Sequence, residues 1–212
     1  MEMESNQQNA YQSAYDLARS QLGEKDPNAI SLNTDTQYDP GSHCLNVRYL
    51  GADYLADCTN GAVVRADGGA PVTTTVKVLI LHYLLHAVKR PHLGKLISFR
   101  EVRGGGANYY PTFHKRAILP LQKTFEKTPD KLILAAAGLD GKPQTYGDVS
   151  VTLPIFPLVP VTYVIWQADD EMSGSAAILF DENVNGFLPC EDIVLAASFG
   201  VYELMKVAKQ LG

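Results

Sequence analysis

The sequence predicts an α+β fold: a single domain with a mostly antiparallel sheet, built from two groups of three strands and flanked by helices. The chain has 212 residues, of which 46% are hydrophobic, and this is enough to bury one sizeable core. The two groups of strand-like segments have helical segments before, between and after them. This order lacks the regular alternation of a doubly wound sheet. We therefore expect residues 1–30 to form an N-terminal helix and arm, and residues 31–212 to form one α+β domain.

In the first half of the chain, apolar residues recur with a helical period from Asn9 to Leu22 and predict an amphipathic helix. The stretch from Glu24 to Ser42 is rich in Asp, Asn, Pro and Gly, and is expected to be a long connection. Three short alternating segments follow, with an Asn60-Gly61 turn between the last two. They predict an antiparallel meander of residues 44–50, 53–58 and 61–67.

In the second half, cap residues from Pro71 to Thr75 precede an apolar helix that ends near Lys89. Further helices are expected from Pro111 to Phe125, from Lys131 to Leu139, and from about Glu191 onward. A strand is expected within residues 96–102, before a run of three glycines. The second group of strands comprises residues 148–156, 159–166 and 176–180.

Net charge, hydropathy and cysteine spacing argue against several classes of protein. The net charge of -5 gives no general electrostatic reason to bind nucleic acid or an anionic membrane, so we expect neither as a partner. The most apolar run, Val76 to Val88, is too short to span a membrane and contains Lys77. The three cysteines lack metal-binding spacing, so no cofactor held by this chain alone is indicated. A reducing, cytoplasmic location fits this composition best.

The segment FREVRGGGANYYPTFHKR is the first candidate site. Its glycines lead into a helix start, where free backbone N–H groups can hold an anion, and positive charges and a tyrosine that can stack on a ring lie nearby. The segment is neither a P-loop nor a dinucleotide-binding turn. A flexible tip beside a solvated basic helix is the alternative. The candidate ligand-binding residues are Arg100, Arg103, Gly104, Gly105, Gly106, Tyr109 and Arg116.

An acidic segment is the second candidate. Trp166 ends a strand and is followed by Asp169, Asp170 and Glu171, and Asp181 ends the next strand. The two strand ends lie far apart in a hairpin unless its loop folds back, so the sequence does not assemble a pair of catalytic carboxylates. A solvated hairpin loop is the alternative. Trp166, Asp169, Glu171 and Asp181 are the candidate ligand-binding residues here, and no catalytic residue is assigned.

Two further patterns favour structural roles. His82 and His86 share one helical face, but Tyr83 replaces the glutamate of the metalloprotease signature, so hydrogen-bonded histidines near the core are favoured over a metal or acid–base role. Cys190 and two acids stand at the start of the last helix. Acids at that position match the helix dipole, and the sequence assigns no base to the thiol.

The segment DENVNGFLPCED has the spacing of a calcium loop, with side-chain oxygens from Asp181, Asn183, Asn185 and Asp192 and a central glycine. Only two of these side chains are charged, and a strand enters the segment where a helix is expected. Asn and Gly are also ordinary turn formers. A turn is therefore favoured over calcium, and no metal is assigned.

Several segments in order resemble a bacterial and archaeal family named domain of unknown function 3786. They include LILHYLL, SFREVRGGGANYY, TFHKRAILPL and IFPLVPVTYVIWQADDE, and the similarity extends from about Ser13 to the C-terminus. The most specific parts are the W-x-x-D-x-E segment and the L-F-D and L-P-x-E-D pair. The chain departs from the pattern at Met172 to Gly174, where Phe-Pro is expected.

The resemblance implies an anaerobe-associated accessory or binding domain. Its expected partners are a corrinoid or iron–sulfur protein of one-carbon metabolism and a small anionic ligand. Two alternatives remain open. One is an enzyme whose acidic site (Trp166, Asp169, Glu171 and Asp181) faces the basic glycine loop, and the other is a structural subunit of a complex.

Overall fold

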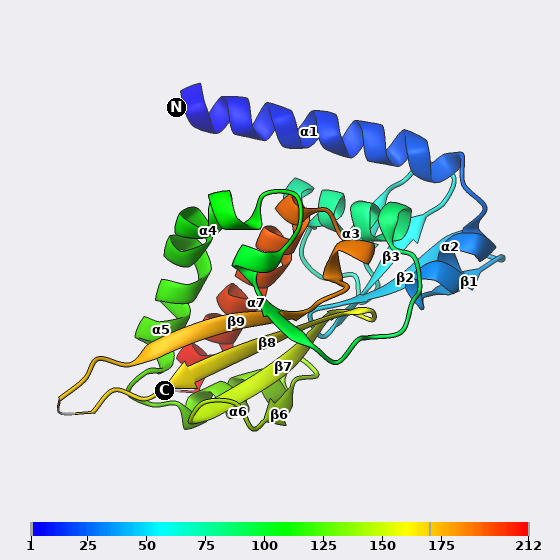
Figure 1. Ribbon diagram of the computed structural model, residues 1–212. Helices are drawn as coiled ribbons and strands as arrows, with labels where there is room; N and C mark the ends of the chain where they lie inside the picture. The colour runs from blue at the N-terminus through cyan, green and yellow to red at the C-terminus, as the bar shows by residue number, and fades with distance from the viewer. Residues whose placement is uncertain (1, 170, 212) are drawn as a thin grey trace.

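The computed structural model describes residues 2–169 and 171–211, and shows a single α+β domain with two antiparallel sheets (Figure 1). The first sheet has four strands in the order β1-β2-β3-β4, and the second has five in the order β5-β9-β8-β7-β6. The predicted fold class is confirmed, but the prediction of two groups of three strands is wrong in number. The strands are β1 Gln37–Asp39, β2 Cys44–Tyr49, β3 Ala52–Asp57, β4 Val63–Arg65, β5 Leu96–Ser98, β6 Lys142–Gln144, β7 Val149–Phe156, β8 Val159–Trp166 and β9 Ser175–Asp181.

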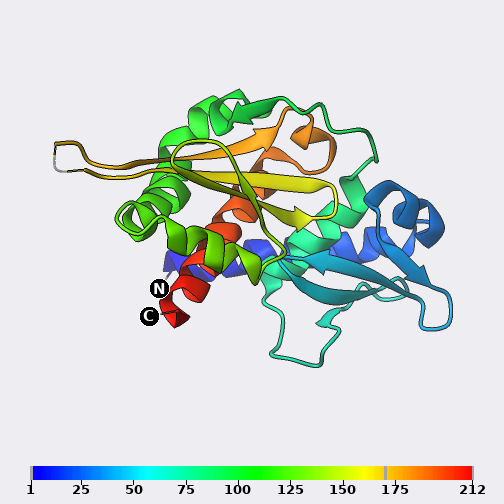
Figure 2. The same cartoon turned by 90° about the horizontal axis from the view of Figure 1, so that it is seen from below.

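The helices lie between and around the two sheets (Figure 2). Helix α7 packs against the five-stranded sheet, and α3 lies where the two sheets meet. Their bounds are α1 Glu2–Gly23, α2 Pro27–Thr34, α3 Thr74–His86, α4 Gly106–Phe113, α5 Leu119–Phe125, α6 Asp130–Ala137 and α7 Cys190–Gln210. No helix in the described ranges is both long and apolar enough to cross a membrane.

The stretch from Glu24 to Ser42 contains α2 and β1, which corrects its prediction as a connection. Asp26 caps α2 by accepting a hydrogen bond from the amide of Asn28, at 3.0 Å. The sequence pattern did not reveal this helix because it has only eight residues and buries only Ile30 and Thr34, which is too few to show a helical period. Asp26, Pro27 and Asn28, which suggested a loop, are its cap and its first turn.

The helix predicted from Pro111 to Phe125 begins at Gly106 instead and is divided by a π-helical segment, His114–Ile118. Pro111 lies inside α4, where it lacks the N–H that would continue the helical ladder. Wider i→i+5 hydrogen bonds such as Leu119 N–H to the His114 carbonyl follow it directly. Together α4, the π segment and α5 form one continuous helical run, Gly106 to Phe125.

Tyr83 on α3 connects three parts of the core. Its ring stacks on Phe156 of β7 with the centroids 4.3 Å apart. Its hydroxyl donates to the carbonyl of Thr34 at the end of α2, and accepts from the amide of Leu158 at 3.3 Å. These partners fix the buried face of α3 relative to α2 and to the five-stranded sheet.

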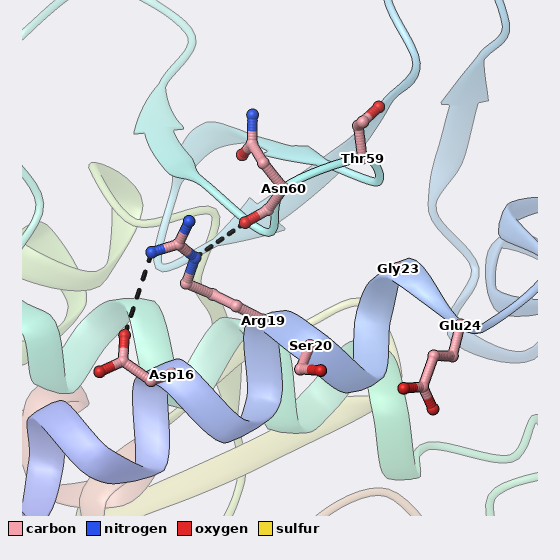
Figure 3. A pocket seen from close by; sticks show the side chains of 7 residues that line it. All are labelled: Asp16, Arg19, Ser20, Gly23, Glu24, Thr59 and Asn60. Carbon is pink, nitrogen blue, oxygen red and sulfur yellow. Dashed lines mark hydrogen bonds and ion pairs between the residues drawn. The ribbon is translucent and has the colours of Figure 1, made fainter.

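Helix α1 is anchored by its C-terminal half. Tyr15 and Ala18 are buried, and the Tyr15 hydroxyl donates to the carbonyl of Gly61 in the β3–β4 turn, at 3.3 Å. Arg19 donates from Nε to the carbonyl of Asn60 at 2.8 Å (Figure 3). Gly61 has a positive φ of 68°, and a Cβ there would lie 2.6 Å from the Arg19 Cα atom. The turn therefore holds the helix closely.

A polar hollow of about 470 Å³ lies beside this anchor, between α1 and the β3–β4 turn (Figure 3). Besides Arg19, it is lined by Asp16, Ser20, Gly23, Glu24, Thr59 and Asn60. Arg19 is already engaged there by Asn60 and, at 3.9 Å, by Asp16. We attribute this hollow to the packing of α1 on the turn.

Candidate functional site

A second cavity, of about 660 Å³, lies between α1, α3, the start of α7 and the run of three glycines from Gly104 to Gly106, which we call the glycine loop. This volume is within the range that holds small organic ligands. The lining residues come from segments far apart in the sequence and are Ala10, Tyr11, Ala14, Val78, His82, Gly104, Gly105, Asn108, Tyr109, Arg116, Cys190, Glu191, Asp192, Val194 and Leu195. Figure 1 shows α1 passing over the ends of α4 and α7 at this point.

The glycine loop is held against α7 by its neighbours. Asn185 accepts from the amide of Arg103 at 2.9 Å and donates to the carbonyl of the same residue at 3.1 Å. Gly104 and Gly105 have φ values of 86° and 123°, which side chains rarely adopt. A Cβ on Gly106 would collide with the carbonyl of Phe99. Glycine is therefore required by the backbone path, which brings the loop to the start of α7.

The backbone of this loop is open to a ligand. Within residues 2–169 and 171–211, the amides of Gly104 and Gly105 have no hydrogen-bond acceptor. Helix α4 begins at the next residue, so its first amides and its dipole face the same region. Tyr109 and Arg116, one and nearly three turns further along this helical run, line the cavity. The arrangement suits a ring-bearing anion.

His82 and Asp192 form a hydrogen-bonded pair in the cavity wall. The Nδ1 atom of His82 lies 2.7 Å from Oδ2 of Asp192, and only 5% of Asp192 is exposed. Asp192 occupies the first turn of α7, where the helix dipole favours a carboxylate. An ionised carboxylate only accepts hydrogen bonds, so it selects the tautomer in which Nδ1 carries the proton. The other ring nitrogen, Nε2, is then an acceptor.

Cys190 lies beside this pair and is a neutral thiol at neutral pH. Partial burial, followed by the charge of Glu191, raises the pKa of the Cys190 thiol above its ordinary value. Cys190 acts as a small lining residue that touches the glycine loop, since a Cβ on Gly104 would be 3.4 Å from its own Cβ.

The structure divides the sequence-predicted ligand-binding residues of the basic segment. Gly104, Gly105, Tyr109 and Arg116 line the cavity, and Gly106 is buried at the start of α4. Arg100 and Arg103 are not lining residues. The guanidinium of Arg100 lies instead over the ring of Tyr110, 4.0 Å from its centroid.

The acidic segment lies elsewhere, at the tip of the hairpin of β8 and β9 (Figure 1). The amide of Ala168 donates to the carbonyl of Glu126, just beyond α5, at 3.0 Å. The glycine loop lies at the opposite end of the helical run from Gly106 to Phe125, which at 1.5 Å per residue is roughly 30 Å long. Trp166, Asp169 and Glu171 are therefore not brought together with the glycine loop. Asp170 lies outside the described residues.

The side chains of the calcium hypothesis have separate partners. Asp181 is buried and accepts hydrogen bonds from the amides of Leu93, Gly94 and Asn183, at 3.2, 2.9 and 3.1 Å. The amide group of Asn183 donates to the carbonyl of Pro91, while Asn185 and Asp192 have the partners given above. Among the described residues, no group of three or more His, Cys, Asp or Glu side chains is arranged to hold a metal ion.

The sequence did not indicate that His82, Asp192 and Tyr11 meet in one cavity. His82 and Asp192 are 110 residues apart, and each fits its own helix without the other. The helical period alone places His82 on the same face of α3 as Val78, four residues earlier. The sequence alone could have shown that this face of α3 carries both apolar and polar residues. It could not have shown that α7 packs against it.

The model of the family described as domain of unknown function (DUF3786) matches residues 26–203, which is most of the chain. No curated protein and no solved structure matches significantly. The match includes α3, the glycine loop and the start of α7, while α1 precedes it. The chain belongs to the DUF3786 family.

Proposed function

We propose that the protein is a binding domain whose cavity, between α1, α3, the glycine loop and α7, holds a small anionic ligand with a flat or apolar body. The observation that carries this proposal is the meeting of Arg116 and the open glycine-loop amides in one cavity. Most of the remaining wall is apolar or aromatic, as in other small-molecule sites.

The charges in the cavity favour recognition of an anion at one end. Asp192 is only 5% exposed and its carboxylate is hydrogen-bonded to Nδ1 of His82, so little of its charge faces the cavity. Arg116 and the start of α4 supply positive potential, and a guanidinium binds carboxylate and phosphate groups in a fixed geometry. Glu191 is exposed and lies at the opposing helix start. The ligand is therefore expected to place its acidic group toward α4 and its ring toward Tyr109.

The test uses the fluorescent probe 8-anilino-1-naphthalenesulfonate, which combines aromatic rings with one anionic group. Arg116→Gln is expected to weaken probe binding by about tenfold, because one charge-assisted hydrogen bond contributes roughly 1.5–3 kcal/mol. The matched control is Arg100→Gln, which removes a charge from the same segment but outside the cavity lining. Equal affinities of both variants and the wild-type protein would contradict the proposal.

The roles proposed for Arg100 and Arg103 from the sequence are tested in the same way. Because neither arginine lines the cavity, the double alanine variant should bind the probe almost as well as the wild-type protein, and a loss of more than tenfold would contradict this. If they act only through their distant charge, the effect is small and vanishes at high salt.

A partner protein is the second part of the proposal, and it rests on the family resemblance. A corrinoid or iron–sulfur protein of one-carbon metabolism is the expected partner. Affinity capture under anaerobic conditions tests this, with ultraviolet–visible spectra to identify a bound corrinoid or cluster. Recovery of neither cofactor class removes this part and leaves the ligand proposal standing.

The two alternatives have less support. An enzyme formed by the acidic hairpin and the glycine loop needs these segments to meet, whereas the helical run between them is roughly 30 Å long. A structural subunit needs a continuous apolar surface. Exposed apolar residues such as Leu32, Leu134 and Met172 belong instead to separate elements.

A further inference from the structure

We propose that His82 is a general base that removes a proton from a carbon atom of the ligand in this cavity, with Asp192 as its positioning residue. This inference deepens the proposed function and rests on it. The substrate class is a carboxylate or phosphate compound with an acidic C–H bond next to a carbonyl group, and the reaction class is enolisation, leading to isomerisation.

The first argument is the orientation of the imidazole. Asp192 is buried, and its hydrogen bond to Nδ1 fixes the ring and leaves the Nε2 lone pair available. No described residue hydrogen-bonds to Nε2, and about 25% of the side chain is exposed in the cavity wall. A carboxylate that orients an imidazole and offsets its charge after protonation is the arrangement by which histidine bases work.

The second argument is the support of the ring from its own helix. The ring of His86, one turn later, meets that of His82 edge to face, with the centroids 5.4 Å apart. The Nδ1 atom of His86 donates to the carbonyl of His82 at 2.9 Å. His86 is therefore occupied as a neighbour and is not a lining residue of the cavity.

The third argument is the environment of the proton transfer. The titratable groups that line the cavity with His82 are Tyr11 from α1, Tyr109 and Arg116 from the α4 run, and Cys190, Glu191 and Asp192 from α7. Apolar side chains from α1, α3 and α7 fill the wall between them and reduce the water around the base.

The chemistry balances within these groups. The proton moves from the substrate carbon to Nε2 of His82, and the C–H electron pair forms an enolate whose negative charge lies on oxygen. Arg116 and the open amides of Gly104 and Gly105 can stabilise this charge. The imidazolium then returns the proton to a neighbouring carbon or to oxygen. No oxidant, reductant or metal is consumed.

The test needs no knowledge of the natural substrate. The probe 5-nitrobenzisoxazole loses its single ring C–H proton to a base, its N–O bond breaks, and a coloured cyanonitrophenolate forms. The wild-type protein is expected to catalyse this reaction above the rate in buffer. His82→Gln should lower the rate by about 100-fold or more, to the buffer rate, since a positioned base contributes roughly 10²–10⁴-fold. His43→Asn, which changes a histidine before β2 and outside the cavity lining, should retain the wild-type rate.

Asp192 is tested by a readout specific to positioning. In Asp192→Asn the kcat is expected to fall about tenfold with little change in KM, and Asp192→Glu should recover part of it. The ¹⁵N shifts of His82 should report a protonated Nδ1 in the wild-type protein and a mixture of tautomers in Asp192→Asn. A wild-type rate equal to buffer, or an unchanged rate in His82→Gln, would overturn the inference.

This outcome is separable from that of the proposed function. The sulfonate probe measures anion binding independently of proton transfer. If His82→Gln and the wild-type protein bind it equally, but neither accelerates the elimination, the base is wrong and the binding site stands. If Arg116→Gln does not affect sulfonate binding, the binding proposal itself fails.

Discussion

Gly200, in the middle of α7, lies directly on the hydroxyl of Tyr163 from β8. That hydroxyl donates to the carbonyl of Ala197 at 3.0 Å, and a Cβ on Gly200 would overlap the hydroxyl oxygen. Both residues are in the core, and burial raises the pKa of Tyr163 above its ordinary value. The absence of a side chain at one position therefore allows a fully buried tyrosine to be satisfied by a helix.

Gly200→Ala is expected to destabilise the protein by about 1–3 kcal/mol, because the added methyl group overpacks a closed site. Urea unfolding measures this. Gly138→Ala is the control, since its nearest atom would be 3.8 Å away, and it should change stability by less than about 0.5 kcal/mol. Combining Gly200→Ala with Tyr163→Phe should restore part of the lost stability. A double variant that is no more stable than Gly200→Ala would contradict this explanation.

Asp181 gives a second prediction at this scale. Its buried carboxylate accepts three backbone hydrogen bonds from the segment before β5 and from the following turn. Asp181→Ala should lower the free energy of unfolding by roughly 1–3 kcal/mol with or without calcium, because buried amide donors lose their acceptor. Glu182→Ala, which removes an exposed ion pair with Lys95, should cost less than about 1 kcal/mol. Calorimetry that detects submicromolar calcium binding by the wild-type protein would refute this structural role as the whole explanation.

At the scale of elements, the N-terminal half of α1 forms one wall of the cavity, while its C-terminal half is anchored at the β3–β4 turn. Among the residues of α1 whose burial is described, the first buried one is Tyr15. Tyr11 is only partly buried. The segment that lines the cavity is thus the less firmly packed half of the helix. It is suited to adjust to a ligand without disturbing the anchor at the β3–β4 turn.

Tyr11→Ala should weaken binding of the sulfonate probe by about three- to tenfold, through loss of aromatic contact. Fluorescence titration measures the affinity, and Leu17→Ala is the control, since Leu17 lies on the same helix and is exposed away from the cavity. Hydrogen exchange at residues 8–14 should slow when the probe is bound. Exchange that is the same with and without probe would show that this half of α1 does not respond.

The acidic hairpin yields the opposite expectation. Trp166→Ala removes a partly exposed ring at the far end of the α4–α5 run. It should leave sulfonate affinity within about twofold of the wild-type value, because the helical run that separates the two regions is roughly 30 Å long. A larger change would mean that the helical run transmits a shift between its ends.

Long elements were predictable because each carries its own pattern. The apolar and β-branched runs of β7 and β8 and the apolar period of α7 identified them from sequence. The edge strands β1 and β6 have three residues each, too few to show a period. In the site, the glycines and Arg116 were recognisable because they belong to one segment of sequence. The pairing of His82 with Asp192 was not, because it depends on packing between helices that are distant in the chain.

At the scale of the whole molecule, the buried tyrosines and Cys58 predict loss of stability in alkaline solution. Burial raises the pKa of the Cys58 thiol to about 11 from its ordinary value of 9.0. The unfolded thiol ionises first, so the unfolded state binds fewer protons, and stability falls as the pH rises from about 9 to about 11. Burial also raises the pKa of Tyr83, which extends this loss to higher pH.

Cys58→Ala should reduce this alkaline loss. Urea midpoints of the variant and wild-type protein at pH 7 and pH 10.5 measure the difference. Cys44→Ala, at the partly exposed start of β2, serves as the control. If the midpoint of Cys58→Ala drops between these pH values as much as that of the control, Cys58 does not contribute.

The order in which the cavity walls are synthesised has a consequence for the cell. Tyr11 leaves the ribosome early and Cys190 leaves late, yet both border the same cavity. A nascent chain that still lacks α7 has no closed ligand site, and the apolar face of its five-stranded sheet is uncovered. Such a chain is prone to aggregate and can be recognised by chaperones. Binding of the proposed ligand can therefore act only on chains that already contain α7, and a product that ends before α7 cannot be stabilised by it.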